Sequence, residues 1–209
     1  MLGDLGARAD VGAKTVLLAW HVDYWDRLGW PDRFANKAHT ARQEAYRQAW
    51  RSRSLMTPQF VVAGRPASRL VPEITAEAAR PASLSIALTV KLLKDGRVET
   101  TVGLKKLHPD LALPPHVMAR VLLFATRVKT VCKAGENAGK TLEEFFPVLN
   151  SFSSQRADEL TLKNVTVYAT VPEGVKPAEL GVAVLVEDPQ GMATIECTSS
   201  PVAMESGGK

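Results

Sequence analysis

The sequence HVDYWDRLGWP occupies residues 21–31 and gathers three aromatic side chains, two carboxylates and a histidine. It follows a short apolar segment over residues 15–20, and the near-continuous apolar run over residues 15–22 is typical of a strand buried on both faces. In α/β proteins, binding sites form where strands deliver their carboxyl ends to loops. We therefore place a candidate cleft at this stretch. Its candidate lining residues are His21, Asp23, Tyr24, Trp25 and Asp26.

The overall composition is that of an ordinary folded protein. The chain has 209 residues, 45% of them hydrophobic and 23% charged, which suits one large domain or two small ones. The net charge is +4, but Lys and Arg are scattered, so we expect no nucleic-acid partner. No segment reaches the ~20 apolar residues that span a bilayer. Residues 1–10 do not resemble a signal peptide, so a chain that truly starts at Met1 is expected to be cytoplasmic.

The two cysteines, Cys132 and Cys197, lie far apart in the sequence. They therefore form neither a Cys-x-x-Cys redox pair nor a zinc knuckle. The simplest interpretation is that both are small buried apolar residues. A structural disulfide between them, in an oxidising compartment, is the alternative.

The first part of the chain alternates helix and strand signals. The pattern predicts the end of a helix at residues 1–9 and a helix over 39–52, in which Tyr46 and Trp50 form an i,i+4 pair. A strand over 57–64 begins with a proline and ends with a glycine. A short helix is predicted over 71–80.

After residue 81 the pattern becomes mainly β. Alternating segments at residues 83–93 and 97–104 flank Asp95-Gly96, a hairpin turn. Further strands are predicted over 117–126, 161–171, 181–187 and 193–197. These strands favour a small sandwich. We predict an α+β protein with domains at 1–81 and 82–200 and a flexible tail at 201–209.

A strand, a long helix and a strand opened by Thr57-Pro58 follow one another in thioredoxin-like order, and we predict that Pro58 is cis. Four blocks closely resemble an uncharacterised bacterial family, the domain of unknown function 1223. These are His21 to Asp26 with Leu28-Gly29-Trp30, Thr40 to Gln43, Thr57 to Gln59 with Gly64-Arg65, and Gly135 to Leu142. The fourth block, GENAGKTL, is similar to that family's Gly-Glu-Asn-Ala-Gly-Arg-Thr-Leu element. The resemblance covers nearly the whole chain.

The resemblance implies a thioredoxin-like fold, usually on an exported protein, with a first strand and a Cys-Ser-Ser-Cys-Pro-Pro-Ala-Asp element. Residues 2–5 are similar to the later part of the helix that carries this element. That strand and both family cysteines would then lie upstream of Met1, and a full-length form would be periplasmic or secreted. We therefore expect an incomplete thioredoxin-like half. Residues 15–22 and 59–63 would each lose a strand neighbour, which invites self-association.

Three further cleft residues come from the second predicted strand. They are Thr57, Pro58 and Gln59, with Trp30, Arg42 and Gln43 as structural support. We expect Arg42 and Gln43 to reach Asp23 or Asp26, with Arg42 in a buried ion pair. Trp20 and Trp50 are expected to pack the helix onto the sheet, whereas Tyr24 and Trp25 either pack in the same way or line a groove.

His21, Asp23 and Asp26, with His39 nearby, are of the types that bind hard or borderline metals. Their spacing matches no established ligand motif, so we favour a hydrogen-bonded turn and expect no metal and no cofactor. Asp23 or Asp26 is chemically able to act as a general base beside His21, but no nucleophile is in view. The segment GENAGK at residues 135–140 is one residue too short for a Walker loop, so a β-turn is favoured.

The sequence thus predicts a noncatalytic binding or envelope-associated accessory module with an unidentified protein or peptide partner. The alternative is a thiol-disulfide oxidoreductase whose Cys-x-x-Cys lies upstream of Met1. A metal-assisted hydrolase, which rests only on His21, Asp23 and His39, is the third hypothesis.

Overall fold

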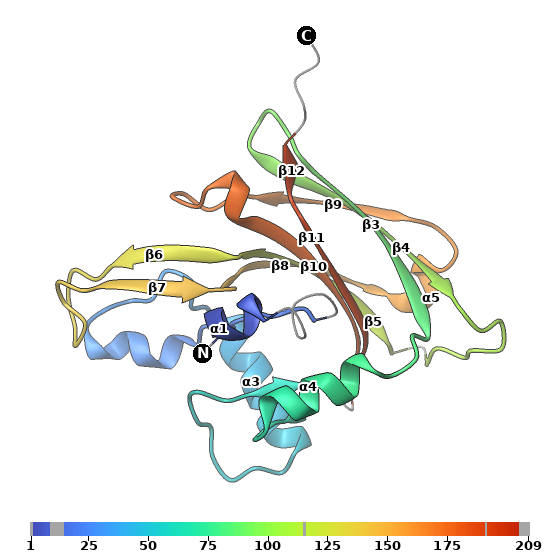
Figure 1. Ribbon diagram of the computed structural model, residues 1–209, viewed down its shortest axis with the longest axis horizontal. Coiled ribbons are helices and arrows are strands. Elements are labelled where there is room, and N and C mark those ends of the chain that lie inside the picture. The colour runs from blue at the N-terminus through green and yellow to red at the C-terminus, as the bar shows by residue number, and fades with distance from the viewer. Residues whose placement is uncertain (1, 9–14, 115, 191, 205–209) are drawn as a thin grey trace.

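Two four-stranded β-sheets, two two-stranded sheets and a group of short helices make up the described part of this protein. A computed structural model describes residues 2–8, 15–114, 116–190 and 192–204. In these residues the strands form two four-stranded and two two-stranded sheets. The longer helices precede residue 79 and the long strands follow residue 83, so the fold is α+β with a β-rich second part, as the sequence predicts (Figure 1).

One four-stranded sheet has the order β12-β3-β4-β9. Its strands are β3 (Leu84–Leu92), β4 (Arg97–Lys106), β9 (Val165–Thr170) and β12 (Ala203–Met204). Strands β3 and β4 form the hairpin that Asp95-Gly96 predicts, and Gly96 adopts a φ of 80°, a conformation that glycine adopts without a steric penalty. Strand β12 pairs in parallel with β3, so part of the segment expected to be a flexible tail lies in a sheet. Residues 205–209 are outside the described residues.

The second four-stranded sheet has the order β11-β10-β5-β8 and is antiparallel throughout. Its strands are β5 (Met118–Ala125), β8 (Val148–Arg156), β10 (Leu180–Asp188) and β11 (Ala193–Pro201). Strand β8 was not predicted, because the sequence VLNSFSSQR is largely polar and does not alternate clearly. Strands β6 (Arg127–Val131) and β7 (Thr141–Phe145) form a hairpin that projects from the sandwich (Figure 1).

Strand β10 is buried on both faces because the second sheet has a neighbour on each side. Successive side chains of a strand point to opposite faces. Val182, Val184 and Val186 belong to the core between the two large sheets. Ala183 and Leu185 belong to a second core on the other face, against which Val16, Leu18 and Trp20 pack. The N-terminal region therefore forms a third layer on the outer face of this sheet.

Three helices of this third layer agree with the sequence patterns. They are α1 (Leu2–Ala7), α3 (Lys37–Ala49) and α4 (Leu70–Ala78). The 3₁₀ helix η1 (Asp23–Leu28) was not predicted, because residues 21–31 were expected to form a loop. Helix α3 begins two residues before the predicted start. Asn36 is its N-cap, and the Asn36 side chain accepts a hydrogen bond of 3.0 Å from the backbone N–H of His39, which satisfies one free donor of the first turn.

Residues 15–22 are extended but do not form the predicted strand of a sheet. Ala19 makes an isolated parallel bridge to Pro147. Its N–H donates to the carbonyl of Phe146 at 2.7 Å, and its carbonyl accepts from the N–H of Val148 at 2.9 Å. The prediction of a sheet strand is wrong because the partner is the short connection between β7 and β8.

The strand predicted over residues 57–64 is also shorter than expected. Only β1 (Val61–Val62) is a strand, and it pairs with β2 (Arg65–Pro66) across a turn at Ala63 and Gly64. The predicted strand over 161–171 begins later, because α5 (Ala157–Leu160) and the turn after it precede β9. A short 3₁₀ helix, η2 (Pro177–Glu179), precedes β10.

Candidate functional site

A cleft of about 1510 Å³ is lined by two segments, residues 15–22 and 57–64. Further lining residues come from α3, α4, β11 and the β6–β7 hairpin. The predicted residues that line this cleft are His21, Trp25, Asp26, Thr57, Pro58 and Gln59, together with the support residues Trp30, Arg42 and Gln43. Asp23 and Tyr24 are not among its lining residues.

The loop at Pro58 lies beside the η1 helix. The Thr57–Pro58 peptide bond is cis, the isomer that the sequence predicts. The indole Nε1 of Trp25 donates to the hydroxyl of Thr57 at 3.1 Å. Trp25 remains 46% exposed and lines the cleft.

Gln43 connects η1 to the segment before Thr57. The Tyr24 hydroxyl donates to Oε1 of Gln43 at 3.0 Å, and Nε2 of Gln43 donates to the carbonyl of Met56 at 2.8 Å. Gln43 is therefore a structural residue, but its partners are not Asp23 or Asp26, and that part of the prediction is wrong. The long amide side chain bridges the Tyr24 side chain and the Met56 backbone, which the sequence pattern does not relate.

Arg42 forms the expected buried ion pair, but with Glu187 of β10 instead of Asp23 or Asp26. Nη1 of Arg42 lies 3.1 Å from Oε2 of Glu187, and Nη2 contacts Oε1. The guanidinium also lies 4.7 Å from the ring centroid of Trp20. Burial disfavours the charged guanidinium, but the Glu187 carboxylate outweighs this and raises the pKa of Arg42. The pair joins the third layer to the sandwich.

Asp23 and Asp26 stabilise the turn, as the hydrogen-bonded-turn hypothesis expects. The Thr40 hydroxyl donates to Oδ1 of Asp23 at 2.5 Å and accepts from the Asp23 N–H at 3.2 Å. Oδ1 of Asp26 accepts from the backbone N–H of Asp32 at 3.0 Å. Both carboxylates thus fix the path of residues 23–32.

His39 is a core residue and lies only 2% exposed. Its Nδ1 lies 3.0 Å from the carbonyl of His21, and its Nε2 lies 3.0 Å from Nδ2 of Asn36. Since the carbonyl accepts and the amide NH₂ donates, the neutral tautomer with the proton on Nδ1 satisfies both contacts. Burial lowers the pKa of His39. Both ring nitrogens are occupied, so His39 does not join a site with His21.

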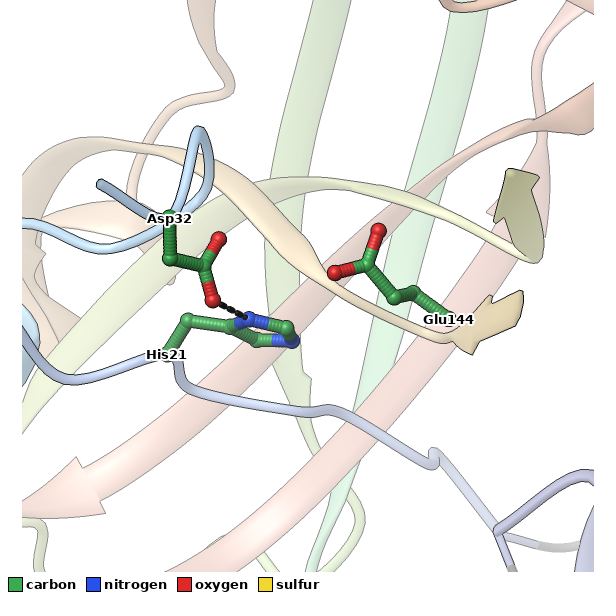
Figure 2. A group of neighbouring side chains, drawn as sticks. All are labelled: His21, Asp32 and Glu144. Carbon is green, nitrogen blue, oxygen red and sulfur yellow. Dashed lines mark hydrogen bonds and ion pairs between the residues drawn. The ribbon is translucent and has the colours of Figure 1, made fainter. Parts of the chain in front are cut away.

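The residues that do gather around His21 are Asp32 and Glu144 (Figure 2). Nδ1 of His21 lies 2.5 Å from Oδ2 of Asp32. The potential ligand atoms of the three side chains all lie within 4.8 Å of one another. Sequence reasoning missed both carboxylates. Asp32 directly follows the quoted stretch, whereas Glu144 comes from β7 and has no local signal.

Burial and neighbouring groups shift the pKa values of all three side chains in the cluster. Burial disfavours the His21 imidazolium, but the Asp32 carboxylate outweighs this and raises the pKa of His21. Burial alone would raise the pKa of Asp32, yet His21 and the backbone N–H of Phe34 lower it. Burial raises the pKa of Glu144, although the Thr130 hydroxyl donates to that carboxylate.

The predicted support residue Trp30 makes packing contacts, as do Trp20 and Trp50, which were expected to pack the helix onto the sheet. Trp20 packs on the outer face of the second sheet. Trp50 stacks on Tyr46 at 4.7 Å between ring centroids, and its Nε1 donates to the carbonyl of Gly64 at 3.2 Å. Trp30 contacts the β6–β7 loop, where a Cβ on Gly135 would lie 3.0 Å from the Cβ of Trp30.

The GENAGK segment, residues 135–140, is part of the loop between β6 and β7. The N–H of Gly139 donates to the carbonyl of Cys132 at 2.9 Å, and Ala138 donates to Gly135 at 3.1 Å. The segment does not open a helix, so the turn hypothesis is confirmed over the phosphate-loop hypothesis.

Both cysteines lie within the described residues and carry free thiols. Cys132 is 1% exposed, which agrees with a small buried apolar residue. Cys197 lies on β11 and lines the cleft. Burial raises the pKa of the Cys197 thiol, which disfavours the reactive thiolate.

Comparison with known proteins gives the family and the fold. A solved Agrobacterium tumefaciens protein is 21% identical, with a TM-score of 0.56, over 92% of this chain and 82% of that chain. HBP35 of Porphyromonas gingivalis is 15% identical, with a TM-score of 0.57, over 82% of this chain and 61% of that chain. The curated proteins contain no match. None of the described helices is both long and apolar enough for a membrane span. A sequence model of the protein family of unknown function DUF1223 matches residues 1–187, and the chain therefore belongs to this family.

Proposed function

We propose that this protein is a noncatalytic binding module that holds an extended polypeptide segment between residues 15–22 and 57–64. We also propose that it serves as an accessory protein of the bacterial envelope. The observation that carries the binding proposal is that Leu18, Trp20 and Gln59 line one cleft and make no backbone hydrogen bond to other described residues.

The first edge of the cleft comes from residues 15–22. In an extended chain, neighbouring residues direct their N–H and C=O groups to opposite sides. Ala19 uses its groups to bind Phe146 and Val148. Leu18 and Trp20 therefore direct their N–H and C=O groups away from Phe146 and Val148. Neither makes a backbone hydrogen bond within the described part of the chain, and both line the cleft.

The second edge comes from the segment that follows Pro58. Phe60 accepts a hydrogen bond from Ala67 on the side of the β1–β2 hairpin. Gln59 lines the cleft and makes no backbone hydrogen bond to any other described residue. An added strand satisfies such groups, and this is how sheet-edge recognition of peptides gains affinity.

Apolar side chains border the same cleft. Trp25 is 46% exposed at its rim, and Leu28 is also 46% exposed. An aromatic side chain provides a large contact area at low entropic cost and retains a polar edge. The chemistry of the cleft therefore suits an extended segment with alternating apolar side chains.

The oxidoreductase alternative finds less support in the described residues. A redox thiol needs a stabilised thiolate, commonly at a helix N-terminus. Cys132 is buried in the loop after β6, and Cys197 lies on a strand with its pKa raised by burial. Neither residue supplies a Cys-x-x-Cys pair.

Site-specific photo-crosslinking tests the binding proposal. A photoreactive phenylalanine analogue replaces Trp25 in the cleft and, as a matched control, Tyr168 on β9, which is 50% exposed outside the cleft. In the native host, we expect a defined polypeptide adduct from position 25 and none from position 168. Hydrogen exchange on the purified complex should then show slower exchange at the amides of Leu18, Trp20 and Gln59.

Two results contradict the proposal. One is equal crosslinking from both positions, which indicates nonspecific contact. The other is a complex that forms without protection of the cleft amides. A crosslink to a second copy of this chain identifies self-association as the interaction.

The envelope proposal rests on the usual export of the family and has a separate test. A tagged copy expressed from the native locus is expected in the periplasmic or membrane fraction, with a cytoplasmic enzyme as the fractionation control. Recovery of the tagged protein with the cytoplasmic control would refute the envelope role and leave the binding proposal intact.

A further inference from the structure

We propose that His21, Asp32 and Glu144 form a binding site for one divalent transition-metal cation of the zinc type. The three residues come from separate segments, which are the end of the first extended segment, the loop after η1, and strand β7. Their side chains converge in Figure 2, with the Asp32 and Glu144 carboxylates directed toward the imidazole of His21.

The ligand atoms are close enough for a single ion. They lie within 4.8 Å of one another, and two ligand atoms of a tetrahedral zinc ion, each about 2.0–2.2 Å from it, lie about 3.3–3.6 Å apart. A metal ion therefore fits the cluster after small side-chain adjustments. In the ion-free molecule, the 2.5 Å contact between His21 and Asp32 holds these two ligands together.

The donor set points to the class of metal. Zinc binds imidazole nitrogen and carboxylate oxygen, whereas calcium and magnesium prefer oxygen ligands throughout. One imidazole with two carboxylates therefore favours Zn²⁺ and similar ions over Mg²⁺ and Ca²⁺. All three side chains also line the cleft, so water or a ligand group can complete the coordination.

Neighbouring groups orient these ligands before any ion arrives. The Thr130 hydroxyl donates to Oε2 of Glu144. The N–H of Phe34 donates to Oδ1 of Asp32 at 2.8 Å, and the Phe34 ring meets the His21 ring edge-on at 5.7 Å between centroids. Such outer contacts fix the direction of ligating side chains and raise metal affinity. The side chains are only partly exposed, at 19% for His21 and 32% for Asp32.

An ion at this position would connect two parts of the fold. His21 and Asp32 flank η1, and Glu144 lies on the projecting β6–β7 hairpin. Binding is therefore expected to raise the melting temperature of the whole chain and to slow hydrogen exchange in β7. Neither effect depends on whether a polypeptide occupies the cleft.

Zinc titration of the full chain tests the site. Isothermal calorimetry with ZnCl₂ is expected to give one saturable site, with weaker or no binding of MgCl₂. Glu144→Gln and Asp32→Asn keep the side-chain size and are each expected to lower zinc affinity about tenfold or more. The matched control is Glu143→Gln on the same strand, since Glu143 pairs with Arg127 outside the cluster, and it should leave affinity unchanged.

A second control addresses adventitious zinc at surface histidines. His116 lies 3.2 Å from Asp188 at a more exposed position. His116→Ala should retain the zinc site, and Co²⁺ should give visible absorption bands that are lost in Glu144→Gln. Circular dichroism of the ion-free variants shows whether they remain folded. If Glu144→Gln does not fold, Asp32→Asn replaces it in the zinc titration. The proposal is overturned if wild type shows no saturable zinc binding, or if His116→Ala abolishes it while Glu144→Gln does not.

Discussion

The replacement Glu187→Gln removes one charge from the most buried ion pair that joins the third layer to the sandwich. Glu187 is 6% exposed and faces two arginines. Arg42 of α3 reaches both carboxylate oxygens, and Nε of Arg120 on β5 lies 3.1 Å from Oε2. Glutamine has the same shape, so the change isolates the effect of charge. It leaves the Arg42 guanidinium, whose side chain is 12% exposed, without its counter-charge.

Removing one partner of a buried ion pair costs about 3–5 kcal/mol, because the remaining charge stays desolvated. For a domain of this size, 1 kcal/mol lowers the melting temperature by about 2–4 °C. Glu187→Gln should therefore reduce the free energy of unfolding by about 3–5 kcal/mol and the melting temperature by about 6–20 °C. Guanidinium denaturation followed by circular dichroism measures the first quantity.

The matched control is again Glu143→Gln, which makes the same chemical change in an exposed pair. The Glu143 and Arg127 side chains are 37% and 54% exposed, so this variant should lose less than about 1 kcal/mol. The double variant Glu187→Gln with Arg42→Met should recover part of the loss, since no unpaired charge remains at position 42. A loss below about 1 kcal/mol in Glu187→Gln would refute the reasoning.

Three further outcomes are expected. Gly64→Ala should lower the melting temperature more than Gly96→Ala. Both glycines have a positive φ, which costs about 1–2 kcal/mol for alanine. At Gly64 the added Cβ would also lie 1.9 Å from the carbonyl oxygen of Met192, whereas at Gly96 it would meet no atom within 4 Å. In denaturant titrations, Leu122→Ala, at 0% exposure, should lose about 2–5 kcal/mol, whereas Leu162→Ala, at 87% exposure, should lose less than about 0.5 kcal/mol. An insulin-reduction assay should show no turnover; turnover that disappears in Cys132→Ser or Cys197→Ser would contradict this.

The β-rich part was predictable because its signals are local. Alternation of apolar and polar residues on both sides of Asp95-Gly96 specified the β3–β4 hairpin. Strand β10 was visible as a continuous apolar run, since both of its faces are buried. Strand β8 was missed because it follows the short 146–147 turn after β7 and carries polar residues.

The two extended segments of the third layer show where local signals fail. Residues 15–22 have the composition of a buried strand, but they are only partly buried, and Val16, Leu18 and Trp20 pack on the face of another sheet. Apolar composition reports burial and does not identify the hydrogen-bond partner. The partner of Ala19 is the connection around Pro147, more than a hundred residues away in the sequence.

The residues of the candidate site also differ in whether a local sequence signal identifies them. His21, Trp25 and the residues around Pro58 were selected because they cluster in sequence or follow a strand-like run. Glu144 and Glu187 were not selected, because each is brought to the N-terminal residues by the fold of the β-rich part. A single sequence contains no local pattern for such long-range pairs. Asp32 was within reach, since it directly follows the residues 21–31 that define the candidate cleft.

The shared core also bears on whether the two parts of the chain unfold separately. The sequence patterns favoured domains at 1–81 and 82–200, and the family resemblance implied two strands without a neighbour in the first. Val16, Leu18 and Trp20 instead pack on the sheet of the second part, and the Arg42–Glu187 pair joins the same layers. Separating the parts would expose this core to water, so we expect one cooperative transition.

The distribution of tryptophan makes this testable without any substitution. All four tryptophans precede residue 51, so their fluorescence reports the third layer alone. Far-ultraviolet circular dichroism reports the helices together with the strands after residue 83, which the tryptophan signal does not include. The two denaturation curves should coincide, with equal midpoints and slopes. A fluorescence transition at a lower denaturant concentration than the circular dichroism transition would mean that the third layer unfolds first. Its contacts with the outer face of β10 would then be too weak to couple the unfolding of the two parts.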